Sequence, residues 1–287
     1  MKTIDKVIAE RFLEDPTSID LSEYMVLDDN AADLLSTFHK STGGGGMLDL
    51  SGLLEISVKS AKALAKMQST TLWLNGLNKI SDDVAKALSK QKNGGLSLNG
   101  LTQLSTQVAG YLSERSAGSL ALDGLKQLSV EVAYEMSHYE GNLSWNGLEE
   151  LSPESARALS YFEWTLYLDG LLEISDQAAQ ELSQFKGWSL YLNGLTKISD
   201  HTAESLSQIE KGAVCLNGLA NLSAEAAKAF SRSACSFSLD GVTNLCAEAA
   251  EALSYSKNMI SLLGLTQVSG SIKELLSKNE LISLQEE

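Results

Sequence analysis

The sequence predicts an α/β solenoid in which a short strand, a tight turn and a helix recur many times along the chain. Three observations predict it. A glycine followed by leucine or valine returns every 23 or 24 residues. Leucines alternate with other residues just before each of these glycines, and a serine followed by a helical apolar pattern comes just after. A chain of 287 residues is too long for one compact core, and repetition is how it can grow.

Ten glycines occupy equivalent positions in the ten regular repeats, and this column of glycines defines how the repeats align. These are Gly52, Gly76, Gly100, Gly124, Gly147, Gly170, Gly194, Gly218, Gly241 and Gly264. A divergent unit precedes them. In it Glu23 stands in the glycine column, Leu27 in an isoleucine column, and Leu35 in the column of helix leucines.

Each unit opens with a short strand that has one buried face. In Leu72-Trp73-Leu74 the two leucines point to one side of the strand and the tryptophan to the other. The pair Asn75-Gly76 follows, and such pairs suit a tight turn because glycine tolerates positive φ and the asparagine side chain can bond to nearby backbone.

A helix is expected next, beginning after a column of serines. Serine is a preferred N-cap, and the column holds Ser57, Ser81, Ser105, Ser129, Ser152, Ser175, Ser199, Ser223 and Ser269, with Cys246 as the exception. Inside the helix Ala85 and Leu88 share a face, which lets the helix lie close to the strands. A second serine column, for example Ser89, closes each helix, where the hydroxyl can satisfy freed carbonyls.

Four segments follow from this reading. They are an N-terminal capping helix (1–18), a divergent first repeat with a Gly-rich insertion (19–47), ten regular repeats (48–278), and a C-terminal capping strand with an acidic tail (279–287). The capping helix rests on Ile4, Val7, Ile8 and Phe12, which share one face before Pro16. The insertion is the run Gly43 to Gly46. The last strand is Leu281 to Leu284, and the tail ends in Glu286 and Glu287.

These residues resemble the bacterial leucine-rich repeat proteins whose repeats are about 24 residues long, with the pattern LxLxGLxxISxxxAxALS. The resemblance covers Leu48 to Ser277, about four-fifths of the chain. It implies short parallel strands on a concave face, helices on a convex face, and binding through the concave side. One departure is plain. The family carries a ladder asparagine just after the strand turn, whereas this chain has Leu77 there and asparagine or aspartate before the glycine.

The charge and the cysteines of the chain restrict which binding partner and which cellular compartment are expected. With 22 basic and 37 acidic residues the net charge is -15, which argues against nucleic acid as a partner. The same field would attract a basic protein, and the alternative is that the charges are simply scattered over helix surfaces. Cys215, Cys235 and Cys246 are odd in number and lack metal-ligand spacing, so they indicate a reducing compartment and small apolar packing. No signal peptide or membrane span is expected, so we predict a cytoplasmic protein, with non-classical secretion left open.

The residue between the two leucines of each strand faces the open side of the sheet, and this column is the variable one. It reads Asp49, Trp73, Ser97, Ala121, Ser144, Tyr167, Tyr191, Cys215, Ser238 and Ser261. Tyr167 and Tyr191 should lie about 4.8 Å apart on neighbouring strands. Trp164 and Trp188 precede those strands and add two rings. Together with Trp73 these aromatics are the predicted partner-binding residues. The alternative is that the tryptophans enter the core and the tyrosines merely stack. Trp145 is expected in the core.

Asp169 and Asn193 complete the predicted binding surface. They belong to the column before the glycine, which can either accept hydrogen bonds from a basic ligand or only shape the turn. We expect no catalytic residue, cofactor or metal, because His39, His138 and His201 fall in unrelated positions and the repeated serines lack a base. The predicted function is a monomeric, non-enzymatic protein-binding scaffold. The alternatives are a homo-oligomerising assembly protein and a host-directed bacterial effector that acts by binding.

Overall fold

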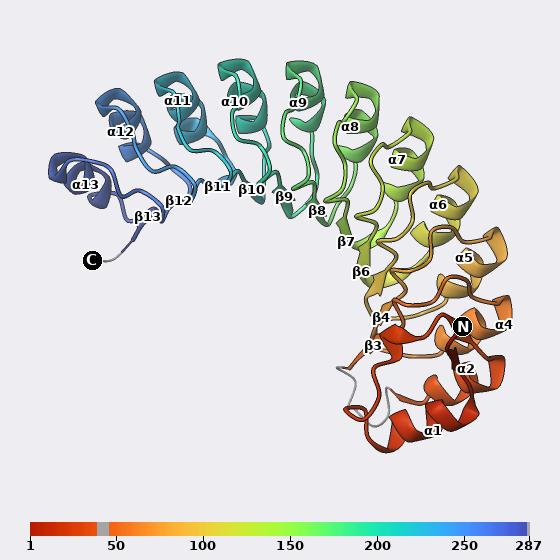
Figure 1. Ribbon diagram of the computed structural model, residues 1–287. Helices are drawn as coiled ribbons and strands as arrows, with labels where there is room; N and C mark the ends of the chain where they lie inside the picture. Colours follow the sequence, from red (N-terminus) through yellow and green to blue (C-terminus); the bar gives the residue numbers. More distant parts are fainter. Residues whose placement is uncertain (39–45, 286–287) are drawn as a thin grey trace. The chain divides into compact units, whose positions relative to one another are not determined.

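The structure is a computed structural model that describes residues 1–38 and 46–285. Three expected features therefore fall outside it: His39, the glycines at 43–45, and the acidic tail at 286–287. By its internal packing the chain divides into two units, Met1–Lys126 with Tyr134–Trp145, and Gln127–Ala133 with Asn146–Glu287. In each unit strands and helices alternate along the chain, and the helices line up on one side of the strands (Figure 1).

The first unit carries the N-terminal elements and the earlier repeats. Its elements are β1 (Thr3–Ile4), α1 (Lys6–Glu14), a 3-10 turn (Leu21–Glu23), β2 (Val26–Leu27), α2 (Asp29–Leu35), β3 (Met47–Asp49), α4 (Val58–Leu64), β4 (Thr71–Trp73), α5 (Asp82–Leu88), β5 (Leu96–Ser97), α6 (Thr106–Ser113), β6 (Ser116–Ala121) and β7 (Glu140–Ser144). β1 and β2 form a small parallel sheet. The strands β3 to β7 follow sequence order in a parallel sheet.

The second unit repeats the same pattern. α7 (Val130–Met136) begins in it, and the later elements are α8 (Pro153–Leu159), β8 (Thr165–Tyr167), α9 (Asp176–Leu182), β9 (Ser189–Tyr191), α10 (Asp200–Ser207), β10 (Ala213–Cys215), α11 (Ala224–Arg232), β11 (Ser236–Ser238), α12 (Ala247–Ser254), β12 (Ile260–Leu262), α13 (Gly270–Ser277) and β13 (Ile282–Leu284). β8 to β13 also stand in sequence order and pair in parallel. The expected C-terminal strand therefore exists and pairs with β12.

The core is the stack of leucines that the alternating pattern predicts. In β8 and β9, Leu166 pairs with Leu190 across the strands, and both side chains are fully buried. Trp145 is also fully buried, as expected. Because a single repeat cannot cover its own leucines, each unit gains its apolar burial from contacts between neighbouring repeats.

The helices begin where the serine column predicts. Ser175, for example, is the N-cap of α9, and its hydroxyl accepts a hydrogen bond from the Ala178 backbone N–H at 3.1 Å. Cys246, the exception in the column, takes the same position at α12 through its sulfur. It is exposed, so the expectation that all three cysteines pack as apolar groups is wrong for Cys246. The closing serines also act as expected, since the Ser89 hydroxyl donates to the Lys86 carbonyl at 3.0 Å.

The glycine column has a different cause from the predicted one. Within residues 1–38 and 46–285 the glycines with positive φ are Gly118 and Gly212, and neither belongs to the column. Instead, a Cβ added at Gly194 would meet the Asp169 carbonyl oxygen of the preceding repeat at 2.1 Å. Glycine is therefore required by the close approach of consecutive turns. Gly52 approaches the carbonyls on either side of Glu23 in the same way.

The N-terminal residues only partly follow the amphipathic prediction. Ile4 is buried, but it lies in β1 ahead of the helix, and in α1 the buried residues are Ala9 and Phe12. Val7 is 58% exposed, so its place on the buried face was wrong. The reason is helical geometry, since Val7 and Phe12 are five residues apart and therefore point about 140° away from each other around the helix axis.

One interior site of the first unit is polar. Arg115 is 1% exposed and donates to the Gln91 side-chain oxygen at 2.9 Å and to the Gly94 carbonyl at 2.7 Å. Burial lowers the pKa of Arg115, while the neighbouring Tyr139 acts in the opposite direction. The Gln91 amide in turn donates to the Thr70 carbonyl at 3.0 Å. These side chains bond strand-entry carbonyls that a leucine would leave without partners.

Candidate protein-binding surface

Two tyrosines stack on the open side of the second unit's strands. Tyr167 of β8 lies directly opposite Tyr191 of β9. Their ring centroids are 4.4 Å apart and the ring planes differ by 20°. The rings stack because parallel strands hold equivalent side chains at about one strand spacing, and both rings are half-buried. The predicted pairing of the two tyrosines is therefore present.

Two tryptophans form a second pair where the same strands begin. The Trp164 and Trp188 ring centroids are 4.8 Å apart, with an angle of 47° between the planes. The backbones are joined too, since the Trp188 N–H donates to the Trp164 carbonyl at 3.3 Å. Trp188 is 60% exposed and Trp164 is half-buried. The alternative that both tryptophans enter the core is wrong for Trp188.

Both aromatic pairs end at β10, where the next repeat has small residues. Cys215 lies opposite Tyr191, and Gly212 follows Trp188 by one repeat. Gly212 has φ +84°, and an added Cβ there would meet the Trp188 carbonyl oxygen at 2.3 Å. No third ring therefore continues either stack on this side, so a flat group from another molecule can lie against Tyr191 or Trp188.

The open end of the tyrosine stack is acidic. Burial raises the pKa of the Cys215 thiol to about 11, and the carboxylates of Asp169 and Asp240 add to the shift. Burial also raises the pKa of Tyr191, with smaller contributions from Cys215, Tyr167 and Asp169. At neutral pH the thiol and the phenol are therefore protonated, and the charges beside them are carboxylates. A cation fits such a place better than an anion.

The column before the glycine forms a ladder of hydrogen bonds, which the sequence left undecided. In the second unit the Asp169 side-chain oxygen accepts from the Asn193 backbone N–H at 2.8 Å. Asn193 does the same for the Asn217 N–H at 3.0 Å, and Asn217 for the Asp240 N–H at 2.9 Å. Asp169 and Asn193 thus hold consecutive turns together. The departure from the family pattern is a shift of the ladder to the other side of the glycine.

Serines of the strand column join this ladder. The Ser238 hydroxyl donates to the Asn217 side-chain oxygen at 2.8 Å, and in the first unit Ser97 donates to Asn75 at 2.7 Å. Where Tyr167 and Tyr191 replace serine, the open face carries rings in place of short hydroxyls. The aromatic pair is therefore a local change in a column where serine is the most frequent residue.

Trp73 has different surroundings. It lies on β4 in the first unit, between Asp49 and Ser97 on the neighbouring strands, and is half-buried. The structure does not pair its ring with another aromatic ring among the described residues. It is a single ring beside a carboxylate, whereas the second unit has stacked rings.

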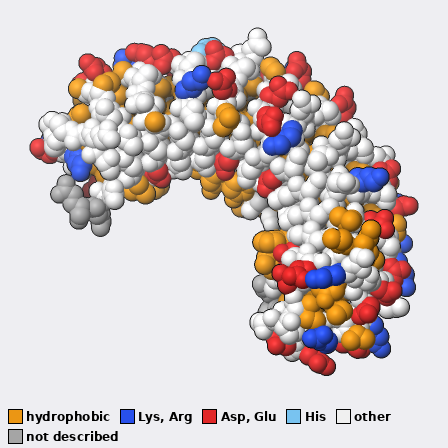
Figure 2. Space-filling view, viewed as in Figure 1, with side chains coloured by type: hydrophobic (Ala, Val, Ile, Leu, Met, Phe, Trp, Pro, Cys, Tyr) orange, Lys and Arg blue, Asp and Glu red, His pale blue; other side chains and the backbone are white. Residues whose placement is uncertain are grey.

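Hydrophobic side chains are also visible as separate groups along the strand side of the second unit, near β8 and β9 and again near β12 (Figure 2). Met259 and Leu263, which flank β12, are exposed. Neither residue lies in the variable strand column, so the strand pattern does not predict them as binding residues. The sequence feature that points to them is their position on either side of a short strand.

Other chemistry finds less support in the described residues. No three His, Cys, Asp or Glu side chains within 1–38 and 46–285 gather as metal ligands. Over the same ranges, no helix has the length and hydropathy to cross a membrane. His138 and His201 are both exposed.

Comparison with known proteins gives similar folds and no related sequence. No protein-family model matches the chain, and no curated protein matches it. Among solved structures, the Toll chain of the Toll–Spatzle complex from Drosophila has 12% identity and a TM-score of 0.49 over 77% of this chain. This match spans 31% of the Toll chain.

Two other solved structures are similar over nearly the whole length of this protein. One is from the complex of Rad7 and Elc1 in yeast, with 16% identity, a TM-score of 0.39, and coverage of 96% of this chain and 84% of that one. The other is an internalin from Listeria monocytogenes, with 14% identity, a TM-score of 0.43, and coverage of 99% and 95%. The repeated strand, glycine turn, capped helix and side-chain ladder of this chain are themselves those of an α/β leucine-rich repeat solenoid.

Proposed function

We propose that this protein is a non-enzymatic scaffold that binds a protein partner through the open strand face of its second unit. The observation that carries the proposal is the pair of aromatic stacks, Tyr167 with Tyr191 and Trp164 with Trp188. In the next repeat the first stack ends at Cys215 on β10 and the second at Gly212 just before β10. Aromatic side chains are the usual anchors of protein interfaces, because they bury much area at little cost in side-chain entropy.

The partner we propose is basic and presents an arginine to this surface. A guanidinium over Cys215 would lie against the outer face of Tyr191 and close to the carboxylates of Asp169 and Asp240. The net charge of -15 would speed the approach of such a partner. A reducing compartment, expected from the free cysteines, belongs to the same proposal.

The first prediction tests the tyrosines. Replacing Tyr167 and Tyr191 by alanine should weaken capture of the partner from a lysate of the native source by about tenfold or more, since anchors of this kind contribute about 2 kcal/mol or more. The melting temperature should change little, because both rings are only half-buried. The measurements are affinity capture with quantitative mass spectrometry and a thermal melt of each variant.

A matched control is available in the same unit. Tyr161 and Tyr255 are 61% and 72% exposed, and they lie after α8 and α12 on the helix side. Replacing both of them by alanine also removes two tyrosine rings, but from outside the stacks, so this variant should capture the partner like the wild type. Equal capture by all three proteins would remove the aromatic stacks from the interface. A second copy of the chain as the captured species, with a dimer in light scattering, would support a homo-oligomeric assembly instead.

A further inference from the structure

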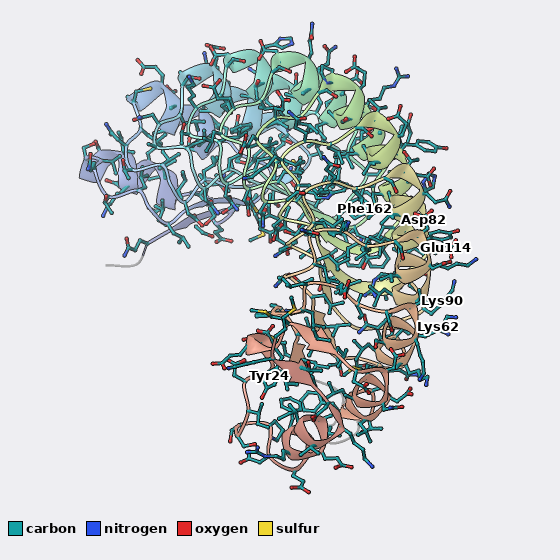
Figure 3. The ribbon with its side chains drawn as sticks, turned by 45° about the vertical axis from the view of Figure 1, so that its right-hand side comes forward. Tyr24, Lys62, Asp82, Lys90, Glu114 and Phe162 are labelled. Atoms are coloured by element: carbon teal, nitrogen blue, oxygen red, sulfur yellow. The ribbon has the colours of Figure 1, made fainter. Side chains whose placement is uncertain are left out.

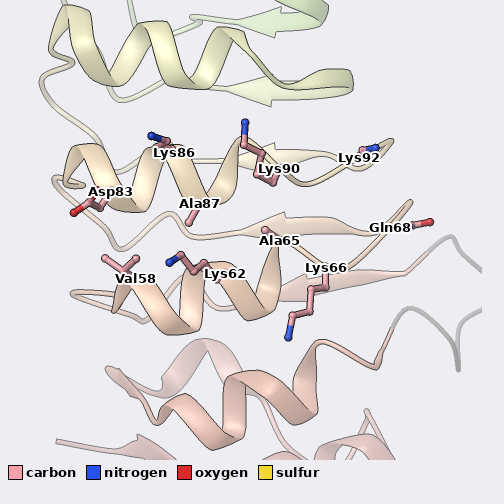
Figure 4. A pocket seen from close by; sticks show the side chains of 10 residues that line it. All are labelled: Val58, Lys62, Ala65, Lys66, Gln68, Asp83, Lys86, Ala87, Lys90 and Lys92. Carbon is pink, nitrogen blue, oxygen red and sulfur yellow. The ribbon is translucent and has the colours of Figure 1, made fainter.

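The helix side of the first unit carries a basic groove, although the protein as a whole is acidic. The groove lies between α4 and α5 and has a volume of about 760 Å³ (Figure 4). Its walls carry five lysines and one aspartate, namely Lys62, Lys66, Lys86, Lys90, Lys92 and Asp83. The net charge of the chain is -15, so this local excess of positive charge runs against the rest of the surface.

Four of these lysines form a regular array across two repeats. Lys62 lies in the last turn of α4 and Lys66 lies just beyond its C-cap. Lys86 and Lys90 occupy the equivalent positions at α5. Figures 3 and 4 show Lys62 and Lys90 on this row of helices. Like charges at this spacing repel one another and destabilise the fold. An anion bound across the array would reduce this repulsion further than its own carboxylate neighbours do.

The intramolecular partners of these lysines are few and weak. Lys66 pairs with Asp33 at 3.5 Å and Lys90 with Glu114 at 3.1 Å, at the two outer edges of the array. All four of those side chains are largely exposed, and such pairs exchange readily with a ligand carboxylate. Lys86 lies over the Tyr111 ring, 5.5 Å from its centroid. Among the described residues no ion pair is found for Lys62 or Lys92.

The second unit contains the same kind of groove with a different charge pattern. Between α11 and α12 a groove of about 630 Å³ has Lys228 and Arg232 on one wall and Glu248 and Glu251 on the other. In the repeat, Lys228 is equivalent to Lys62, and Glu251 is equivalent to Lys86. The geometry of stacked helices therefore does not require lysine on both walls. The α4–α5 groove sets five lysines against one carboxylate, whereas the α11–α12 groove has Glu248 and Glu251 facing its basic wall.

We infer that the α4–α5 groove binds an acidic peptide segment of a partner protein. Ala65 and Ala87 give it a nearly buried apolar floor, and the lysines supply up to five ammonium groups for carboxylates. A long polyanion such as nucleic acid fits less well. Asp33 and Glu114 stand at the two edges of the array, and the net charge of -15 repels an extended phosphate backbone.

The test uses a fluorescently labelled hexaglutamate peptide and the complete chain. Binding is measured by fluorescence anisotropy at low salt. Replacement of Lys62 and Lys86 by glutamine should weaken it by about tenfold. Binding to the wild type should also weaken as salt is added, since the contacts are exposed charge pairs. Circular dichroism melts establish that the variant is folded.

The matched control replaces Lys228 and Arg232 by glutamine, which makes the same change in net charge in the α11–α12 groove. It should leave hexaglutamate binding unchanged. The inference is overturned if the wild type does not bind the peptide, or if the control loses as much affinity as the groove variant. It is also overturned if an oligothymidine binds more tightly through the same lysines, which would make the site one for nucleic acid.

Discussion

At the scale of single residues, the fold depends on positions where no side chain fits and on an interior position where an apolar side chain could not replace a polar one. The column glycines lie so close to the preceding turn that a methyl group would overlap a backbone carbonyl. At Arg115, in contrast, a charged side chain lies in the interior, and its guanidinium donates hydrogen bonds to three acceptors. Neither role can be reduced to hydrophobic patterning.

Gly194 to alanine should destabilise the protein by about 1–3 kcal/mol, because the new Cβ would lie 2.1 Å from a backbone oxygen that cannot rotate away. Gly270 is the comparison. It begins α13 with nothing within 4 Å of an added Cβ, and its change to alanine should stabilise by about 0.4–1 kcal/mol. Urea unfolding of the two variants measures both effects. Equal stability of the two would show that turn spacing does not restrict the glycine column.

At the scale of elements, three kinds of contact join neighbouring repeats. Leucines stack between strands, and the Asn/Asp ladder bonds each turn to the next. On the helix side a third contact appears, in which the Ser223 hydroxyl, itself the N-cap of α11, donates to the Asp200 carboxylate of the preceding helix at 2.5 Å. Each contact links one repeat only to its neighbour, so stability is close to a sum over repeat interfaces.

Asn217 to alanine should cost about 1–3 kcal/mol, because it removes the acceptor of the Asp240 N–H and of the Ser238 hydroxyl. Asn78 is exposed and lies just outside the ladder, so its change to alanine should fall within about 0.5 kcal/mol of the wild type. Chemical denaturation followed by circular dichroism compares the two. A loss at Asn78 as large as that at Asn217 would contradict a structural ladder.

At the scale of the whole molecule, the net charge is the property that acts across many repeats at once. The chain carries -15 at neutral pH and has a sequence pI of about 4.7. An overall excess of carboxylates repels itself, and the folded state brings those charges closer together than the unfolded chain does. The acidic strand face therefore agrees with the overall charge, and the lysine groove is a local exception to it.

Sodium chloride should raise the melting temperature at pH 7, by several degrees between about 0.02 and 0.3 M, because the Debye length falls and the self-repulsion is screened. At pH 4.7, where the sequence pI places the net charge near zero, the same salt series should have little effect. Differential scanning calorimetry at both pH values provides the measurement. An equal rise at the two values would assign the salt effect to burial of apolar surface and not to charge.

The sequence by itself determined the repeat, its strand and helix positions, the leucine core and the serine caps, because these depend on local periodicity and on contacts that recur at a fixed spacing. It also brought Tyr167 and Tyr191 together, since a parallel register places equivalent residues side by side. Both follow from the regular spacing of the chain.

The tertiary structure alone decided what depends on the distance between one turn and the next. It assigned the glycines to backbone approach, turned Asp169 and Asn193 into ladder residues, exposed Trp188 and Cys246, and buried Arg115. It also decided that a groove is open between the two helices that carry the lysines. These outcomes arise from pairs of atoms in different repeats, and a residue's type and position within one repeat do not specify which atoms its neighbour presents.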